Sequence, residues 1–240
     1  MHFKKVFMLV FSIFILTEAF STASYSLGIS AGVSTWYTWW ELDQNGEDGK
    51  IDMGDTLMYG PMVALRFSPQ WSLSSAFLYG KFENSSDSDG PPEEIKRYDS
   101  DTALNYSLNK YFRIFAGFKF MGYKFEGGKN NGYGPGIGIG IVLPVTEQFI
   151  IMGSFSGLYQ WGTEEDDENG VTYESDVTSK GFNTSLALAY YIPAASVTLS
   201  AGFRYQYLDM EIDETYNNRT KNMDHTFYGF TFSAAYSLEL

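Results

Sequence analysis

The chain has 240 residues, a formal net charge of −13 and a sequence pI of about 4.5, and it contains no cysteine. Disulfides, thiolate nucleophiles and cysteine-based metal sites are therefore excluded, and the acidic balance argues against nucleic acid as a partner. With 44% hydrophobic and 18% aromatic residues the chain is not intrinsically disordered, and its length fits one sizeable domain or two small ones.

The N-terminus carries the pattern of a secretory signal peptide. Two lysines, Lys4 and Lys5, form a positive n-region, an apolar stretch of residues follows, and small residues continue up to Ala23. The apolar stretch is too short to cross the ~30 Å hydrocarbon layer as a helix. The sequence therefore predicts a signal peptide at residues 1–23, which directs the chain across the inner membrane, followed by one domain at residues 24–240.

The rest of the chain alternates with a period of two residues, which is the pattern of β-strands. In the first segment, Ser24–Glu41, apolar residues such as Ile29 and Val33 fall on one face, and Gly28 and Ser30 fall on the other. Nine further segments follow the same pattern: Thr56–Ser68, Ser72–Glu83, Asp99–Leu108, Phe112–Phe125, Tyr133–Leu143, Phe149–Trp161, Phe182–Ile192, Val197–Tyr207 and Thr226–Leu240. We therefore expect ten strands.

The connections between these segments alternate between short and long. Four are tight: Pro69–Gln70, Asn109–Lys110, Pro144–Gln148 and Pro193–Ser196. Five are long, polar and acidic: about Leu42–Asp55, Asn84–Tyr98, Gly127–Gly132, Thr163–Lys180 and Asp209–His225. Short turns at one end, long loops at the other and an even number of strands are typical of bacterial outer-membrane barrels, in which a closed sheet leaves no backbone edge unpaired in lipid.

A soluble β-sandwich also alternates, but it usually carries charge on its solvent face. Here the second face is mostly Gly, Ser, Ala, Asn and Thr. Aromatic residues also gather at strand ends, where a membrane girdle is expected: Trp36, Trp39, Trp71, Tyr111, Tyr159, Trp161, Tyr190 and Tyr205. These features favour an all-β, ten-stranded, antiparallel up-and-down transmembrane barrel over the sandwich.

Residues 24–240 resemble the small outer-membrane β-barrel proteins of Gram-negative bacteria, through pattern and not through a specific motif. The final strand alternates as theirs does, with Phe230, Phe232 and Tyr236 on one face, but it ends on Leu240 where such proteins usually end on an aromatic residue. The resemblance implies location in the outer membrane, contact with lipid and lipopolysaccharide, and assembly by the barrel assembly machinery.

Ten strands also resemble the omptin surface proteases, which use an Asp–His pair on the extracellular rim. After the predicted signal peptide the only histidine is His225, next to Asp224. The spaced Asp-x-His arrangement of omptins is absent, and neighbouring residues of a strand point to opposite faces. A lone histidine in a loop is usually solvated surface. We therefore expect no catalytic residues and no enzyme, and keep an omptin-like protease as a remote alternative.

Two further sequence patterns could indicate a ligand-binding site. Glycines alternate from Gly132 to Gly140, but a phosphate-binding fingerprint needs another spacing between a strand and a helix. The densest acidic run is Glu164, Glu165, Asp166, Asp167 and Glu168. We interpret it as a hydrated loop, with weak binding of divalent cations, for example against lipopolysaccharide phosphates, as the alternative. No cofactor and no firm metal site are predicted.

A few charged residues fall on the small-residue face, which lines the lumen of a barrel: Arg66, Asp101, Arg113, Lys119, Arg204 and Glu239. Buried charges are costly unless they are paired or hydrated, so these groups either form a polar plug or line water. We expect a plugged or very narrow lumen, because long side chains cross much of a small barrel.

The sequence thus predicts a non-enzymatic outer-membrane barrel with long acidic extracellular loops and a surface-interaction or structural role, with an extracellular partner that the sequence does not identify. The alternative is a narrow, weakly anion-selective channel for small solutes.

Overall fold

The computed structural model describes residues 27–44, 50–84, 93–168, 171–214 and 219–239. They form ten strands and one short 3-10 helix, η1 (Pro193–Ala195). The strands are β1 (Gly28–Gln44), β2 (Lys50–Arg66), β3 (Trp71–Asn84), β4 (Glu93–Ser107), β5 (Phe112–Phe125), β6 (Gly128–Pro144), β7 (Phe149–Glu168), β8 (Val171–Ile192), β9 (Val197–Glu214) and β10 (Arg219–Glu239). Within these residues no helix has the length and apolar character needed to cross a membrane.

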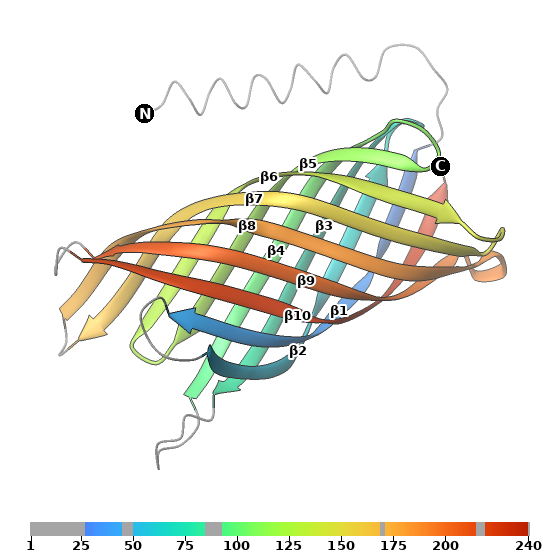
Figure 1. Cartoon of the computed structure of the whole chain (residues 1–240). Helices are drawn as coiled ribbons and strands as arrows, with labels where there is room; N and C mark the ends of the chain where they lie inside the picture. Colours follow the sequence, from blue (N-terminus) through green and yellow to red (C-terminus); the bar gives the residue numbers. More distant parts are fainter. Residues whose placement is uncertain (1–26, 45–49, 85–92, 169–170, 215–218, 240) are drawn as a thin grey trace.

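The strands form one closed antiparallel barrel in which each strand pairs with its neighbours in the chain (Figure 1). The first and last strands close it, with Gly28 opposite Glu239 at one end and Gln44 opposite Met223 at the other. The strands run at a marked tilt to the long axis of the barrel (Figure 1), as closure requires. The prediction of a ten-stranded up-and-down barrel is confirmed.

The two ends of the barrel differ from what the sequence predicted. The four tight connections are present at the turn end, but the described parts of the five segments predicted as long loops are almost entirely strand, while residues 45–49, 85–92, 169–170 and 215–218 of these segments lie outside the described residues. β7 and β8, for example, stay paired as far as Glu168 and Val171. For the described residues the prediction of loop was wrong, because alternation continues through these segments with the apolar side chains on the inner face. A search for an apolar outer face does not recognise that pattern.

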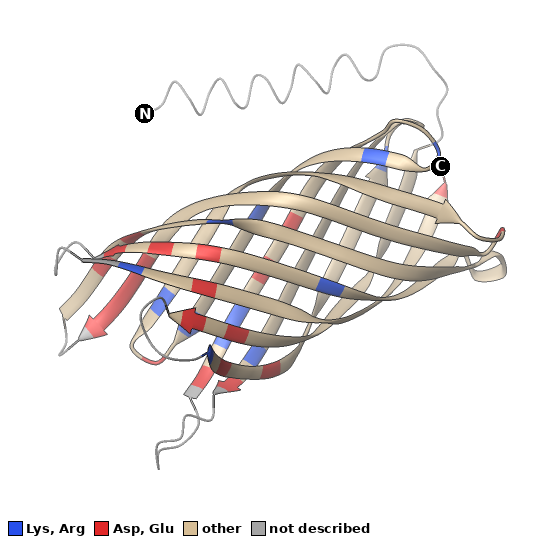
Figure 2. Cartoon of the chain, viewed as in Figure 1, with Lys and Arg blue, Asp and Glu red and all other residues tan. Residues whose placement is uncertain are grey.

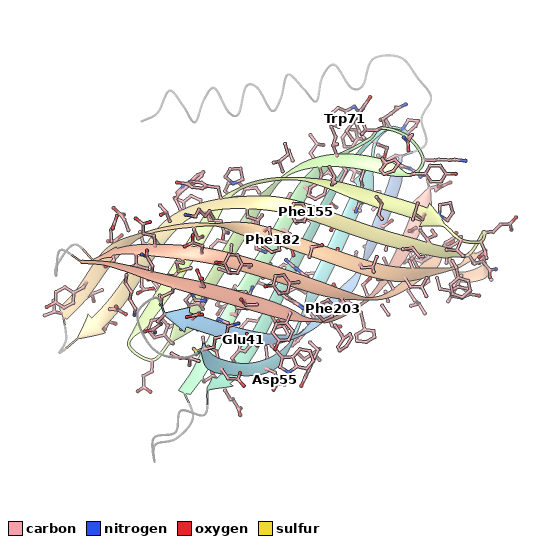
Figure 3. All side chains as sticks on the ribbon, in the orientation of Figure 1. Glu41, Asp55, Trp71, Phe155, Phe182 and Phe203 are labelled. Carbon is pink, nitrogen blue, oxygen red and sulfur yellow. The ribbon has the colours of Figure 1, made fainter. Side chains whose placement is uncertain are left out.

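The outer face of the barrel is apolar in its middle and at its turn end. Phe155, Phe182 and Phe203 project outward from the middle of the barrel, while Trp71 lies at the turn end (Figure 3). Ile137 is 73% exposed and has no protein neighbour to cover it. Exposed apolar side chains around a whole barrel indicate a lipid-facing band. Tyr133 and Trp161, in edge-on contact, belong to the aromatic girdle at the loop side of this band.

Beyond this girdle, toward the loop end, the barrel continues as an extension with the opposite polarity. Most of the acidic residues lie at this end of the barrel (Figure 2), among them Glu41 and Asp55 (Figure 3). Its interior holds the apolar core: Trp36, Trp40, Leu42, Met58, Leu78, Phe82, Ile95, Met121, Tyr123, Val177, Leu208, Met210, Ile212, Met223 and Phe227. We call the part on the loop side of Trp39 and Tyr228 the extracellular extension, after the side of outer-membrane barrels on which the longer connections lie. We call the buried cluster, which begins at Trp36 and continues into this extension, the apolar core.

Candidate functional site

An ion-pair network crosses the lumen at the level where the lipid-facing band meets the extracellular extension. Asp99 on β4 is 1% exposed, and its carboxylate accepts hydrogen bonds from Lys119 Nζ at 2.6 Å and from Arg97 Nη2 at 2.9 Å. Asp101, two residues further and therefore on the same inner face, accepts from Lys119 Nζ at 3.1 Å. The alternation of β4 thus turns Arg97, Asp99 and Asp101 into one row of lumen-facing charges.

Arg204 connects this row to the far wall of the barrel. It comes from β9, and its Nη2 donates to Asp101 Oδ2 at 2.8 Å, while its Nε donates to the side-chain oxygen of Asn183 on β8 at 3.1 Å. Asp99 lies 3.8 Å from the same guanidinium. Two carboxylates from β4 are therefore held between cations from β4, β5 and β9, and the network (Arg97, Asp99, Asp101, Lys119 and Arg204) spans the lumen.

Aromatic rings cover the network on its loop side. The guanidinium carbon of Arg97 lies 3.5 Å from the ring centre of Phe227, and that of Arg204 lies 4.5 Å from the ring centre of Trp36. Cation–π contacts of this kind are favourable where the cation is desolvated. They matter for Arg97 because its Nε and Nη1 are buried with no hydrogen-bond partner. Charged and aromatic side chains thus pack against one another across the lumen at this level.

His225 belongs to the apolar core above the network. Trp40 Nε1 donates to His225 Nδ1 at 3.1 Å, and the Tyr123 hydroxyl lies 3.5 Å from Nε2. Burial, reinforced by the positive charges of Arg97 and Lys221, lowers the pKa of His225 to about 3. The ring is therefore neutral at physiological pH, and since Nδ1 accepts a hydrogen bond the proton sits on Nε2.

The prediction that His225 is a solvated loop residue was wrong. β10 begins at Arg219, so His225 lies within a strand and its side chain is 2% exposed. Asp224 points to the outer face, where the Tyr207 hydroxyl bonds to it, so the two neighbours do not form a pair. Burial against Trp40 and Tyr123 gives His225 the role of a packed core residue.

The remaining lumen-facing charges lie nearer the turn end. Arg66 Nη2 and Glu239 Oε1 form an exposed ion pair of 2.7 Å at the mouth of the barrel. Arg113 on β5 lies between that mouth and the network, and its buried Nε has no hydrogen-bond partner.

The aromatic residues assigned to the girdle fall on two different faces. Trp39, Trp71, Tyr111, Tyr159, Trp161, Tyr190 and Tyr205 are exposed or partly exposed on the outer surface. Trp36 is 0% exposed inside the lumen, so its assignment to the girdle was wrong. It follows Ser34 at an interval of two residues and therefore shares the inner face.

The acidic run does not form one cluster. It lies on β7, where alternation sends neighbouring residues to opposite faces. Glu164 accepts a hydrogen bond from Asn130 at 2.9 Å, Glu165 pairs with Lys129 at 2.9 Å, and Asp167 accepts from Thr172. The side chain of Glu168 lies outside the described residues. In the described part of the chain no group of three or more acidic or histidine side chains is arranged to hold a metal ion.

Sequence reasoning missed Arg97 and the apolar core. It began the fourth strand at Asp99, whereas the strand begins at Glu93. A signal was available, because Ile95, Arg97, Asp99 and Asp101 follow one another at intervals of two. Extending the strand toward its N-terminus places Arg97 beside Asp99 on the inner face.

Comparison with known proteins gives a likeness of fold alone. No protein-family model matches the chain, and no curated protein matches it in sequence. Among solved structures, the outer membrane protease OmpT from Escherichia coli matches with a TM-score of 0.58 at 12% identity, covering 91% of this chain and 99% of that one. The translocator domain of the autotransporter NalP from Neisseria meningitidis matches with a TM-score of 0.48 at 10% identity, covering 97% and 95%.

The attachment invasion locus protein Ail of Yersinia pestis matches more loosely, with a TM-score of 0.34 at 10% identity over 87% of this chain and 98% of that one. At identities of 12% and below, these likenesses carry no statement about the function of this chain. The chain has the closed antiparallel barrel fold of Gram-negative outer-membrane proteins.

Proposed function

We propose that the chain is a non-enzymatic and non-conducting outer-membrane barrel, whose extracellular extension provides a surface for interaction with a partner outside the cell. One observation carries the proposal: the network and the apolar core fill the lumen from wall to wall. Asp99 and Lys119 are each 1% exposed, and Trp36 and Phe227 are 0% exposed. A solute crossing the barrel has to displace both layers.

The closed lumen argues against the channel alternative. Ions that pass through a pore need a hydrated path with weak, successive contacts. Here the charges that were candidates for lining such a path, Lys119 and Arg204, are engaged by Asp99 and Asp101. Breaking a buried charge pair costs ~3–5 kcal/mol, so spontaneous opening is rare.

The outer face of the extracellular extension supports a role in interaction. Asp43, Asp224 and Asp209 lie opposite one another on β1, β10 and β9. Like charges directly opposite across strands are destabilising. Lys50 lies opposite Asp43, and Lys180 pairs with Asp209 at 3.0 Å, so the two ends of the row are partly compensated. Asp224, in the middle, lies opposite carboxylates on both sides, and we interpret this part of the row as a contact surface for a cationic partner or for cation-bridged lipopolysaccharide.

The placement of His225 argues against the omptin-like alternative. His225 is buried, neutral and bonded to Trp40, and Asp224 lies on the other face of the strand. An omptin-like mechanism needs a histidine and a carboxylate together at an accessible rim, and this histidine is not accessible.

Planar-bilayer recording of the barrel extracted from the membrane tests the proposal. The wild-type protein is expected to stay silent, while Arg204→Ser, which removes the link to the far wall, is expected to give brief openings. Arg66→Ser is the matched control, because it removes a positive charge from the open mouth of the barrel and leaves the network intact. This variant should stay silent. Heat-modifiable mobility on a gel verifies folding. Reproducible wild-type openings would overturn the proposal and restore the channel.

A further inference from the structure

The lumen holds a cavity on the turn side of the network, whose wall combines charged and hydroxyl side chains with apolar ones such as Phe115 and Leu158. Its volume is about 320 Å³, at the lower end of the ~300–1,000 Å³ typical of small-molecule sites. Lys119 and Arg204 of the network line one part of it, and Arg113 lines another. The rest of the wall is rich in hydroxyl side chains: Ser34, Ser74, Ser154, Ser156, Ser185, Ser200 and Ser233.

Toward the turn end the cavity adjoins a second hollow, which is lined by Gln70 and Lys110 at the tight turns and shares Asn105 and Arg113 with the first. In barrels of this class the short turns face the periplasm. Because the network closes the other direction, the space is a vestibule that opens to the periplasm alone.

Arg113 is the one basic side chain of this wall whose buried nitrogen is unsatisfied. Its Nε has no hydrogen-bond partner, and no ion pair among the described residues includes this arginine. The side chain lies along the backbone of β6 at Gly140, where an added Cβ would stand 2.4 Å from Nε. Because Gly140 has no side chain, it leaves room for the Arg113 side chain to lie against the wall.

The β-sheet register places the polar groups of the cavity in one row. Reading from β5 to β9, Arg113 is opposite Gly140, which is followed by Ser154, Ser185 and Arg204. The hydroxyls of Ser154 and Ser185 lie 2.7 Å apart. One hydroxyl hydrogen joins the two oxygens, which leaves the second hydroxyl free to donate to a ligand. Two guanidinium groups thus flank a pair of hydroxyls.

The charge of this part of the lumen is positive, although the whole chain carries −13. Four cations, Arg97, Arg113, Lys119 and Arg204, accompany two carboxylates, Asp99 and Asp101. Asp101 also lines the cavity, but Lys119 and Arg204 hold its oxygens. Low-dielectric walls focus the remaining positive field into the vestibule.

We propose that this vestibule is a binding site for a small oxyanion, such as a phosphate monoester, that enters from the periplasm. Arg113 supplies the charge and the fork of donors that suits a phosphate or carboxylate. The Ser154–Ser185 pair supplies a hydroxyl donor, and the surrounding serines suit a small hydroxylated body. The site adds periplasmic ligand binding to a barrel whose proposed working surface lies outside the cell.

The absence of cysteine allows a direct test with a single introduced thiol. Ala187 lines the cavity without a polar role, so Ala187→Cys places a reporter there. The folded barrel in non-ionic detergent is treated with an anionic or a cationic methanethiosulfonate reagent, and the rate of modification of the cysteine is measured. Each rate is divided by the rate at which the same reagent modifies a free thiol in solution, which removes the difference in intrinsic reactivity. The anionic reagent is expected to react faster, and inorganic phosphate is expected to slow both reagents.

Adding Arg113→Gln to the reporter is expected to lower the anionic-to-cationic rate ratio about three- to tenfold, as loss of one nearby charge predicts. Gly140→Ala should lower the ratio with the arginine retained, because its Cβ displaces the side chain. Arg66→Gln, which removes a paired charge at the mouth, is the matched control and should leave the ratio nearly unchanged.

Heat-modifiable mobility on a gel verifies that each variant has folded. If Arg113→Gln does not fold, Gly140→Ala provides the test in its place. Equal rate ratios in the reporter and in these variants would overturn the proposal. Absence of protection by phosphate would also overturn it.

Discussion

The two halves of β10 follow one alternation but reverse its polarity. On the turn side the outer face reads Leu238, Tyr236, Phe232 and Phe230, and the inner face reads Ser237, Ala235, Ser233 and Thr231. On the loop side the outer face carries Asn222 and Asp224, and the inner face carries Phe227, His225 and Met223. The change falls at Tyr228, whose hydroxyl bonds to Glu41.

β1 reverses at the same level, after Trp39. Ile29 and Val33 face outward before it, and Glu41 and Asp43 face outward after it, while Trp40 turns inward. The strand itself does not distinguish the two regions. What changes is the medium around the barrel, lipid below the girdle and water above it, and each face takes the polarity that its surroundings require.

The comparison also locates the main packed core. In the lipid-facing band the interior is small and polar, so side-chain packing contributes little there, and stability comes from the backbone ladder and from contact with lipid. In the extracellular extension Trp40, Phe82 and Phe227 pack as they do in a soluble protein. Substitutions at equivalent inner positions should therefore differ strongly between the two regions.

The largest expected difference is between inner-face residues of the two regions. Trp40→Ala removes a side chain that is 2% exposed, and it should lower the free energy of unfolding by ~3–5 kcal/mol. Ser233→Ala, on the inner face of the band, loses one hydrogen bond to Ser200 and should cost about 1 kcal/mol or less. Urea unfolding in one detergent measures both, and equal losses would contradict the account.

At the boundary between the two regions, Asp99→Asn should be comparably damaging. It leaves Arg97 and Lys119 buried without their shared carboxylate, at a cost of ~3–5 kcal/mol. Asp101→Asn is the matched control and should cost less, because Asp101 is 36% exposed and accessible to water. Equilibrium unfolding of both variants checks the order, and the reverse order would show that Asp101 is the centre of the network.

On the outer face, the larger loss of stability is expected in the lipid-facing band and the smaller one in the extracellular extension. Ile139→Arg places a charge in the middle of the lipid-facing band, and it should cost ~2–4 kcal/mol. Thr178→Arg, exposed on the outer face of the extracellular extension, should change stability by less than about 0.5 kcal/mol. Refolding into lipid vesicles provides the measurement, and similar costs at the two positions would mean that lipid extends over the extension.

A smaller effect is expected from pH. The folded pKa of His225, about 3, lies below its unfolded value near 6.5, so protons bind preferentially to the unfolded chain. The stabilisation from the neutral ring is complete above pH 6.5 and is lost as pH falls toward 3. Between pH 7 and pH 5 the wild type should lose about 2 kcal/mol more than His225→Phe. Parallel losses in the two proteins would show that His225 is hydrated.

The barrel could be predicted from the sequence, because alternation and the spacing of turns depend on local residues. The full length of the strands could not, since the apolar face moves from outside to inside beyond the girdle. The segment Thr163–Lys180 was interpreted as a loop for this reason, although Val177 continues the inner face of β8.

The candidate site was predictable only in part. Periodicity assigns Lys119 and Arg204 to the small-residue face, but pairing between β4 and β9 depends on the curvature and shear of the closed barrel. Trp36 shows the limit of composition: a tryptophan near a strand end resembles a girdle residue, and only its interval from Ser34 indicates the lumen.

The reversal of polarity at the girdle is the central claim, and spin labels along the outer face of β10 test it most directly. Single cysteines at Phe232, Phe230, Thr226 and Asp224 are labelled in lipid bilayers, and collisions with oxygen and with a water-soluble nickel complex are compared. Labels at 232 and 230 should favour oxygen, and labels at 226 and 224 should favour nickel. Oxygen preference that continues to position 224 would place the extension within the membrane and contradict the account.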